Sequence, residues 1–161
     1  MRRSELIGLM WDDIDPVNKI IHIQRAVTQT TGKIIIGDPK SETSNRYIPI
    51  SDSLISIINL IPRKSQYVFS GNSPHEPINP HSYADKFERF MEKASRELNI
   101  PKLTPHELRH TYGTLLLEKG VDIYTIQKVM GHSDVSVTAD VYIHNNINVL
   151  RKQLKIDVGE T

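Results

Sequence analysis

The sequence predicts an α+β fold that is mainly helical and contains one small antiparallel sheet. Apolar residues recur at helical spacing at residues 4–10, 52–60, 81–98, 105–119 and 122–130. Short extended segments, separated by glycine, proline and polar residues, lie between the first two helices. The length of 161 residues is enough for one ordinary domain with a substantial core.

The sheet is predicted from residues 19–27, 33–36 and 46–50. Apolar and polar side chains alternate in the first segment, and glycine-containing turns follow the first and second. A three-stranded antiparallel sheet is the simplest arrangement, with Lys40 on its second connection.

The helical spacing also predicts which side chains face the core. The helix at 52–60 is expected to bury Leu54, Ile57, Ile58 and Ile61, and the helix at 81–98 is expected to bury Phe87, Phe90, Met91 and Ala94. A last helix, which begins at Asn145 and ends at Lys155, has a narrow apolar stripe suited to docking, formed by Ile147, Leu150 and Leu154.

The helix entrance at Thr104 carries the first candidate site residues. Thr104 and Glu107 have the spacing of a capping box, and Pro105 occupies the first helical position. His106 and Arg109 then lie one turn apart on the same face of the first turn. A helix N-terminus favours anions, so an imidazole and a guanidinium placed there indicate a phosphate site.

Two bends follow this helix. Asp122 can cap the next helix, Gly131 ends it, and His132 lies in the bend. Ser133 or Asp134 can cap a third helix, whose face carries Tyr142 together with Val135 and Ala139. These bends can bring His132 and Tyr142 close to His106 and Arg109.

A zinc site is the competing interpretation. His106 to His110 reads HELRH, which matches the HExxH pattern of zinc metalloproteases. Leu116, however, stands where the longer form of that pattern has its third histidine. Glu107 is also better explained as the capping partner of Thr104. Phosphate chemistry is therefore favoured over zinc.

Composition excludes several classes of site. The net charge of +1 gives no general argument for a polyanion partner, so a nucleic-acid surface must come from local clusters. The candidate clusters are Arg2 with Arg3, Arg46, Arg63 with Lys64, and Arg151 with Lys152 and Lys155. The absence of cysteine excludes disulfides and thiol nucleophiles. No apolar run has membrane-spanning length, and a cytoplasmic protein is expected.

The ordered segments MRRSEL, DPKSETSNR, HELRH, GHSD and TADVYIH resemble the catalytic domain of the tyrosine recombinases, the phage-integrase family. The resemblance covers nearly the whole chain, and it includes LMWDDID after the first arginine. Carried over residue by residue, it implies an active site of Arg2, Lys40, His106, Arg109, His132 and Tyr142.

The resemblance implies metal-independent cleavage and rejoining of DNA strands through a 3′-phosphotyrosine, with no cofactor. Tyr142 is the implied nucleophile, Lys40 the general acid for the leaving 5′-oxygen, and His106 the acid/base. Arg2 and Arg109 are expected to hold the non-bridging oxygens, and His132 to donate to the phosphate. Glu5 is either an orienting partner of the arginines or an ordinary helix-face charge.

The resemblance also implies the surroundings of the domain. Residues 1–161 are expected to be a catalytic domain truncated at its N-terminus, without the upstream DNA-binding domain of the family. The implied partners are double-stranded DNA and, at synapsis, a tetramer formed through the helix from Asn145 to Lys155. An inactive remnant that binds DNA weakly is the alternative within the family.

Overall fold

The computed structural model describes residues 1–37 and 45–131. Its helices are α1 (Arg3–Ile7), α2 (Asp52–Asn59), α3 (Pro80–Leu98), α4 (Pro105–Glu118) and α5 (Ile123–Met130), with a short 3-10 helix at Trp11–Asp13. The strands are β1 (Ile14–Asp15), β2 (Ile20–Ile23), β3 (Ala26–Thr30), β4 (Lys33–Gly37) and β5 (Arg46–Pro49). The predicted fold class is confirmed. The helices predicted after Ser133 and from Asn145 lie outside the described residues.

The strands form two sheets, and only one of them has three strands. β2 pairs antiparallel with β1 on one side and with β5 on the other, while β3 and β4 form a separate hairpin. The predicted strand at 19–27 is therefore divided. The division falls at Gln24 and Arg25, whose side chains both donate to the buried carboxylate of Asp13.

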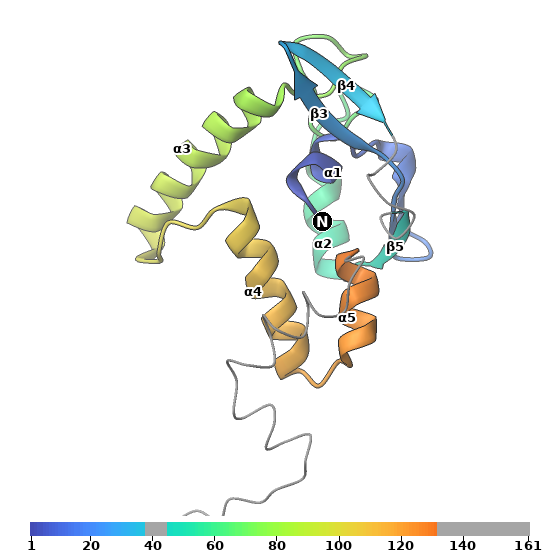
Figure 1. The fold of residues 1–161 in the computed structure, drawn as a ribbon, viewed down its shortest axis with the longest axis vertical. Helices are drawn as coiled ribbons and strands as arrows, with labels where there is room; N and C mark the ends of the chain where they lie inside the picture. The colour runs from blue at the N-terminus through green and yellow to red at the C-terminus, as the bar shows by residue number, and fades with distance from the viewer. Residues whose placement is uncertain (38–44, 132–161) are drawn as a thin grey trace, which may run out of the picture.

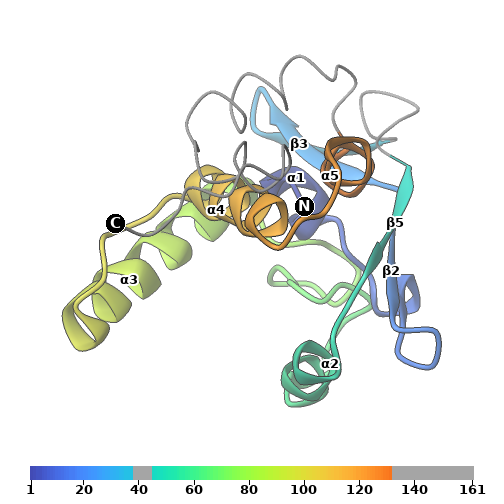
Figure 2. The same ribbon diagram turned by 90° about the horizontal axis from the view of Figure 1, so that it is seen from below.

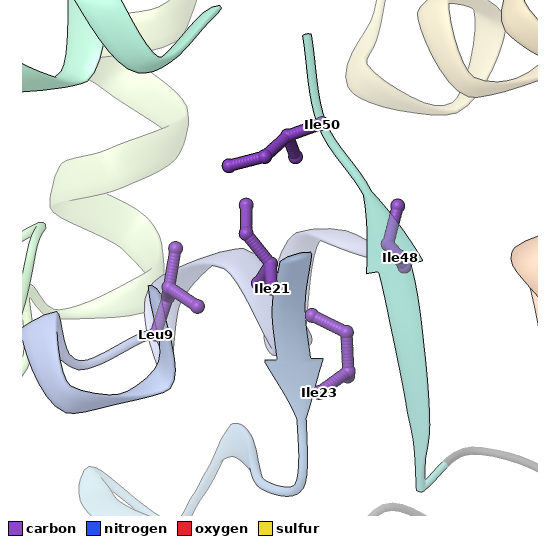
Figure 3. Close-up of a cluster of buried hydrophobic side chains, with 5 residues drawn as sticks. All are labelled: Leu9, Ile21, Ile23, Ile48 and Ile50. Carbon is purple, nitrogen blue, oxygen red and sulfur yellow. The ribbon is translucent and has the colours of Figure 1, made fainter. Parts of the chain in front are cut away.

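The three-stranded sheet packs its inner face into the main core. Leu9, Ile21, Ile23, Ile48 and Ile50 form this cluster (Figure 3). Buried and more exposed residues alternate along β2 and β5, as the two-residue period of a strand requires. Arg46 has the same parity as Ile48 and is also buried, so a charged side chain faces inward at the start of β5.

The predicted inner faces of two helices need correction. No side chain of α2 is buried, and Leu54 and Ile57 are exposed, because α2 contacts the core mainly through Ile55. Figure 2 shows α2 projecting from the rest of the molecule. In α3, Met91 is buried as predicted but Phe90 is exposed. Neighbouring helical residues point about 100° apart, so Phe90 faces away from the side that Met91 buries.

Helices α4 and α5 form an antiparallel pair (Figure 1). Leu117, Ile126 and Met130 make the buried contact between them. This pairing brings the start of α4 and the end of α5 to the same side of the molecule, where α1 lies (Figure 1). Three segments that are distant in sequence thus meet at one place. Within the described ranges, no helix combines the length and apolar character needed to cross a membrane.

Candidate active site

The start of α4 has the predicted capping box. The backbone N–H of Thr104 donates to the Glu107 carboxylate at 2.6 Å, and the N–H of Glu107 donates to Thr104 Oγ1 at 3.2 Å. The bond from the Thr104 N–H lowers the pKa of Glu107, so this side chain is held as a carboxylate. Pro105 begins the helix, and His106 and Arg109 lie in its first turn as predicted.

The capping box also decides the use of Glu107. A zincin would need this carboxylate beside a metal held by His106 and His110. Here Glu107 closes the helix end instead. Across residues 1–37 and 45–131, no three His, Asp or Glu side chains are grouped so that they could hold a metal ion. The HELRH segment therefore begins a helix, and its glutamate serves as the cap of that helix.

One pocket collects the described site residues. It has a volume of about 310 Å³ and is lined by Met1, Arg2, Arg3, Pro105, His106 and Arg109. The lining comes from residues 1–3, which lead into α1, and from the beginning of α4. Within the described part of the chain, it contains three arginines and one histidine but no carboxylate. This composition suits an anion that can accept several hydrogen bonds.

The end of α5 orients two arginines of this pocket, Arg2 and Arg109, and also binds Arg46, which lies outside the lining. Arg2 donates through Nη2 to the carbonyl of Gly131, and Arg109 donates through Nη2 to the carbonyl of Met130. Arg46 donates through Nε to the carbonyl of Val129 at 2.8 Å. The last carbonyls of a helix have no partner within it and carry its negative dipole end, so they attract cations.

The carboxylate of Glu5 connects Arg2 and Arg46. It accepts from the Arg2 backbone N–H at 2.6 Å and from Arg2 Nη1 at 2.9 Å. It also accepts from Arg46 Nη1 at 3.0 Å and from Arg46 Nη2 at 2.9 Å. Only 2% of Glu5 is exposed. Of the two predicted roles for Glu5, the structure supports an orienting partner of Arg2.

The charge state of Glu5 follows from these contacts. Burial alone would raise the pKa of Glu5, since it disfavours the carboxylate. The hydrogen bonds from Arg46 and Arg2 outweigh burial and lower the pKa to about 2. Glu5 therefore stays ionised at any physiological pH and balances one of the guanidinium charges that meet at the end of α5.

The structure thus brings together three of the six predicted site residues, Arg2, His106 and Arg109. The other three, Lys40, His132 and Tyr142, lie outside the described residues. Arg46 was predicted to belong to a basic nucleic-acid surface, and this was wrong, because only 8% of it is exposed. The alternation along residues 46–50 contained the signal, since it places Arg46 on the same side as Ile48 and Ile50.

Gly131 is required by two features of this arrangement. Its φ of 68° lies in the left-handed region. A Cβ atom there would lie 2.6 Å from Arg46 Nη1 and 2.7 Å from Arg46 Cζ. The backbone of Gly131 therefore packs directly against the guanidinium of Arg46, and glycine is the residue that permits both the turn and the contact.

Replacing Glu5 with glutamine should change how stability depends on pH. The pKa of Glu5 is about 2 in the folded protein and 4.5 in the reference state. The stabilisation by its carboxylate is thus fully present above pH 4.5 and is lost as the pH falls toward 2. This difference corresponds to on the order of 3 kcal/mol at neutral pH.

We expect Glu5→Gln to lower the free energy of unfolding at pH 7 and to flatten its decline between pH 4.5 and 2, as measured by urea denaturation. Asp85→Asn, which changes an exposed carboxylate on α3, is the matched control. Equal effects of the two substitutions across this pH range would contradict the assigned role of Glu5.

Replacing Gly131 with alanine should destabilise the protein more than replacing Gly120. Both glycines follow a helix and have positive φ, of 68° and 82°. Alanine costs roughly 1–2 kcal/mol at either position for the backbone conformation alone. At Gly120 no atom of the described residues lies within 4 Å of the added Cβ, whereas at Gly131 the added Cβ meets Arg46. We expect a further loss of about 1–3 kcal/mol at Gly131. Thermal or urea unfolding of the two variants measures this difference, and equal losses would rule out the close contact with Arg46.

Comparison with known proteins agrees with the geometry. The family model described as "Phage integrase family" matches residues 1–148. A tyrosine recombinase XerC-like protein of Caldanaerobacter subterraneus subsp. tengcongensis is 31% identical, and the match covers 89% of this chain and 42% of that protein. The ICEBs1 integrase of Bacillus subtilis is 26% identical, with 89% of this chain and 41% of the relative covered.

A solved structure shows the same fold. The Tn1549 transposon integrase in complex with transposon right end DNA superposes with a TM-score of 0.80 at 27% identity. That match covers 96% of this chain and 54% of the integrase chain. The chain thus spans about half the length of the relatives that it matches. On the evidence of the family match and of the shared fold, the chain belongs to the phage integrase family.

Proposed function

We propose that residues 1–161 form the catalytic domain of a site-specific DNA recombinase that cuts and rejoins strands through a phosphotyrosine, without a metal ion. The single observation that carries this proposal is the pocket that joins Arg2 to His106 and Arg109. Two guanidinium groups held at fixed carbonyls and one exposed imidazole can bind a phosphodiester and move a proton beside it.

The proposed reaction needs no outside energy source. The Oη atom of Tyr142 forms a bond to phosphorus, the bond from phosphorus to the 5′-oxygen breaks, and a 3′-phosphotyrosine results. A 5′-hydroxyl of another strand then attacks the same phosphorus and releases Tyr142. The phosphoester is exchanged twice and never hydrolysed, so each step stays reversible.

The proposed roles of the site residues are charge stabilisation and proton transfer. Arg2 and Arg109 bind the non-bridging oxygens and stabilise the charge that builds up in the transition state, a task that divalent metals perform in other enzymes. His106 takes the proton of Tyr142, and Lys40 gives a proton to the leaving 5′-oxygen. His132 donates a hydrogen bond to the phosphate. The roles of Lys40, His132 and Tyr142 rest on the sequence motif, because these residues lie outside the described ranges.

A second pocket supports double-stranded DNA as the substrate. It has a volume of about 570 Å³ and shares Arg2 and Arg3 with the first pocket. It extends over β3 and the start of α3, and its remaining lining is Ser4, Val27, Thr28, Gln29, Pro80, His81 and Ala84. This second pocket adds hydroxyl, amide and imidazole groups beside the two shared arginines, so together the two pockets offer contacts to more than one phosphate of a polynucleotide. A DNA substrate also agrees with the cytoplasmic location expected from the sequence.

The type of substrate is proposed from the relatives. One of them is named as the integrase of a transposon and was solved with transposon end DNA. We propose that this chain likewise acts on the end sequences of a mobile element or phage, in integration or excision.

Covalent trapping tests the function. On a nicked suicide substrate made from the attachment region of the host element, with EDTA present, the protein should form a covalent DNA adduct visible in a denaturing gel. Tyr142→Phe removes the nucleophile and should abolish the adduct while leaving DNA binding intact.

The outcomes separate the candidate functions. An adduct that survives Tyr142→Phe would contradict the assigned nucleophile, and an adduct that requires a divalent metal would contradict the role of the arginines. DNA binding without any adduct would favour the inactive remnant.

The family resemblance also supports a tetramer on DNA. We propose that the helix from Asn145 to Lys155, outside the described residues, joins neighbouring protomers through Ile147, Leu150 and Leu154. Replacing these three residues with serine should shift protein–DNA complexes to fewer protomers in analytical ultracentrifugation, with binding of one protomer to a half-site unchanged. An unchanged distribution of complexes would overturn this interface.

A further inference from the structure

Arg46 lies at the centre of the site without lining its pocket. It is the first residue of β5 and points inward, with 8% of its surface exposed. Its Nη1 and Nη2 atoms donate to the two carboxylate oxygens of Glu5, at 3.0 Å and 2.9 Å. Its Nε atom donates to the carbonyl of Val129 at 2.8 Å. One guanidinium thus joins β5, α1 and the end of α5, and the residues lining the phosphate pocket do not include it.

The guanidinium of Arg46 also supports Gly131, at the end of α5. The Gly131 backbone packs so closely on Arg46 that a Cβ would lie 2.6 Å from Nη1. The carbonyl of Gly131 is the group to which Arg2 donates through Nη2. Arg46 therefore fixes the position of a carbonyl that orients Arg2.

Arg46 also fixes the second group that holds Arg2. Glu5 accepts from Arg2 Nη1 at 2.9 Å and is held from its other side by the two bonds from Arg46. The side chain of Arg2 is 39% exposed, so packing alone does not immobilise it. Glu5 and Gly131 both hold its guanidinium, and Arg46 contacts both of them.

We infer that Arg46 is a positioning residue for Arg2, which sets the direction of the phosphate-binding guanidinium through Glu5 and Gly131. The inference deepens the proposed function and rests on it for the link to cleavage. Arg46 does not touch the substrate, and its effect passes through Arg2.

The geometry requires arginine at this position. A planar guanidinium supplies two parallel donors to one carboxylate and a third donor in the same plane. Lysine keeps the charge but has a single, rotating ammonium group that cannot span Glu5 and Val129 in this manner. Arg46→Lys therefore keeps a cation beside Glu5 and removes the geometry, which makes it the informative variant.

The first measurement reads the position of Arg2 directly and does not require activity. The arginine N–H resonances of the full chain are recorded by NMR with ¹⁵N-arginine, and Arg2 is assigned through Arg2→Lys. In the wild type, the bonds to Glu5 and Gly131 should slow rotation of the Arg2 guanidinium. In Arg46→Lys this rotation should become fast.

Arg25→Lys is the matched control. Arg25 also forms an ion pair with a buried carboxylate, Asp13, but no contact links it to the end of α5 in the described structure. We expect the Arg2 signals to stay unchanged in this variant. Unchanged Arg2 signals in Arg46→Lys would overturn the inference.

The second measurement tests whether the position of Arg2 affects the rate of strand cleavage. Single-turnover adduct formation at saturating protein should slow by roughly tenfold or more in Arg46→Lys, because misplacing a catalytic group by about 1 Å can cost up to a hundredfold. Arg25→Lys should stay close to the wild type, and the affinity of Arg46→Lys for DNA should change little.

A double-mutant comparison separates positioning from a general loss of structure. In an Arg2→Lys background, Arg46→Lys should have little further effect, because the residue through which it acts has already been changed. Independent, multiplying effects would contradict the inference. If Arg2 loosens as expected while the wild type itself forms no adduct, the proposed function fails and the positioning of Arg2 by Arg46 stands.

Discussion

The structure depends on the way in which the last turn of α5 is stabilised. Three carbonyls at this helix end, those of Val129, Met130 and Gly131, accept hydrogen bonds from arginines of β5, of α4 and of the residue that precedes α1. A helix end inside a protein needs partners for these groups, and here the partners are charged side chains from distant segments. The same bonds that complete α5 also hold two arginines beside the first turn of α4.

This arrangement has an electrostatic cost that Glu5 reduces. Buried guanidinium groups are unfavourable unless they are paired, and Glu5 is buried together with Arg46 and bonded to Arg2 as well. Hydrophobic residues of similar volume could fill this space with comparable stability. They could not hold the guanidinium of Arg2 in a fixed direction, so the buried charges are best explained by what they orient.

The helices of this protein could be predicted because their signals are local. Thr104, Pro105 and Glu107 define the start of α4 within four residues, and Asp122 and Gly131 bound α5 in the same way. The strands were harder, because pairing depends on residues far along the chain. β2 pairs with β1 and with the distant β5 rather than with β3, the segment that follows it, and the break at Gln24 is made by contacts with Asp13.

The same difference between local and long-range signals applies to the candidate site. Arg2, His106 and Arg109 could be found from an ordered motif, and the structure places them around one pocket. Arg46 was assigned to a candidate basic surface, although the alternation along residues 46–50 places it on the same side as Ile48. This pattern indicates that Arg46 faces inward, but its partners, Glu5 and the end of α5, are distant in the sequence and are not revealed by it. The face of α2 and the position of Phe90 in α3 were mispredicted for a related reason, because periodicity gives the apolar side of a helix but not how much of it meets a partner.

The long sequence separations within the site affect how it forms during folding. The bonds from Arg2 to Gly131, from Arg46 to Val129 and from Arg46 to Glu5 join residues 129, 83 and 41 positions apart. Contacts of this kind form late, because the ends of long loops must meet before any bond compensates for the lost entropy. A growing or partly unfolded chain therefore has no assembled arginine pair. The proposed strand cleavage needs these arginines side by side, so a chain that has not completed its fold lacks the site that the proposal requires.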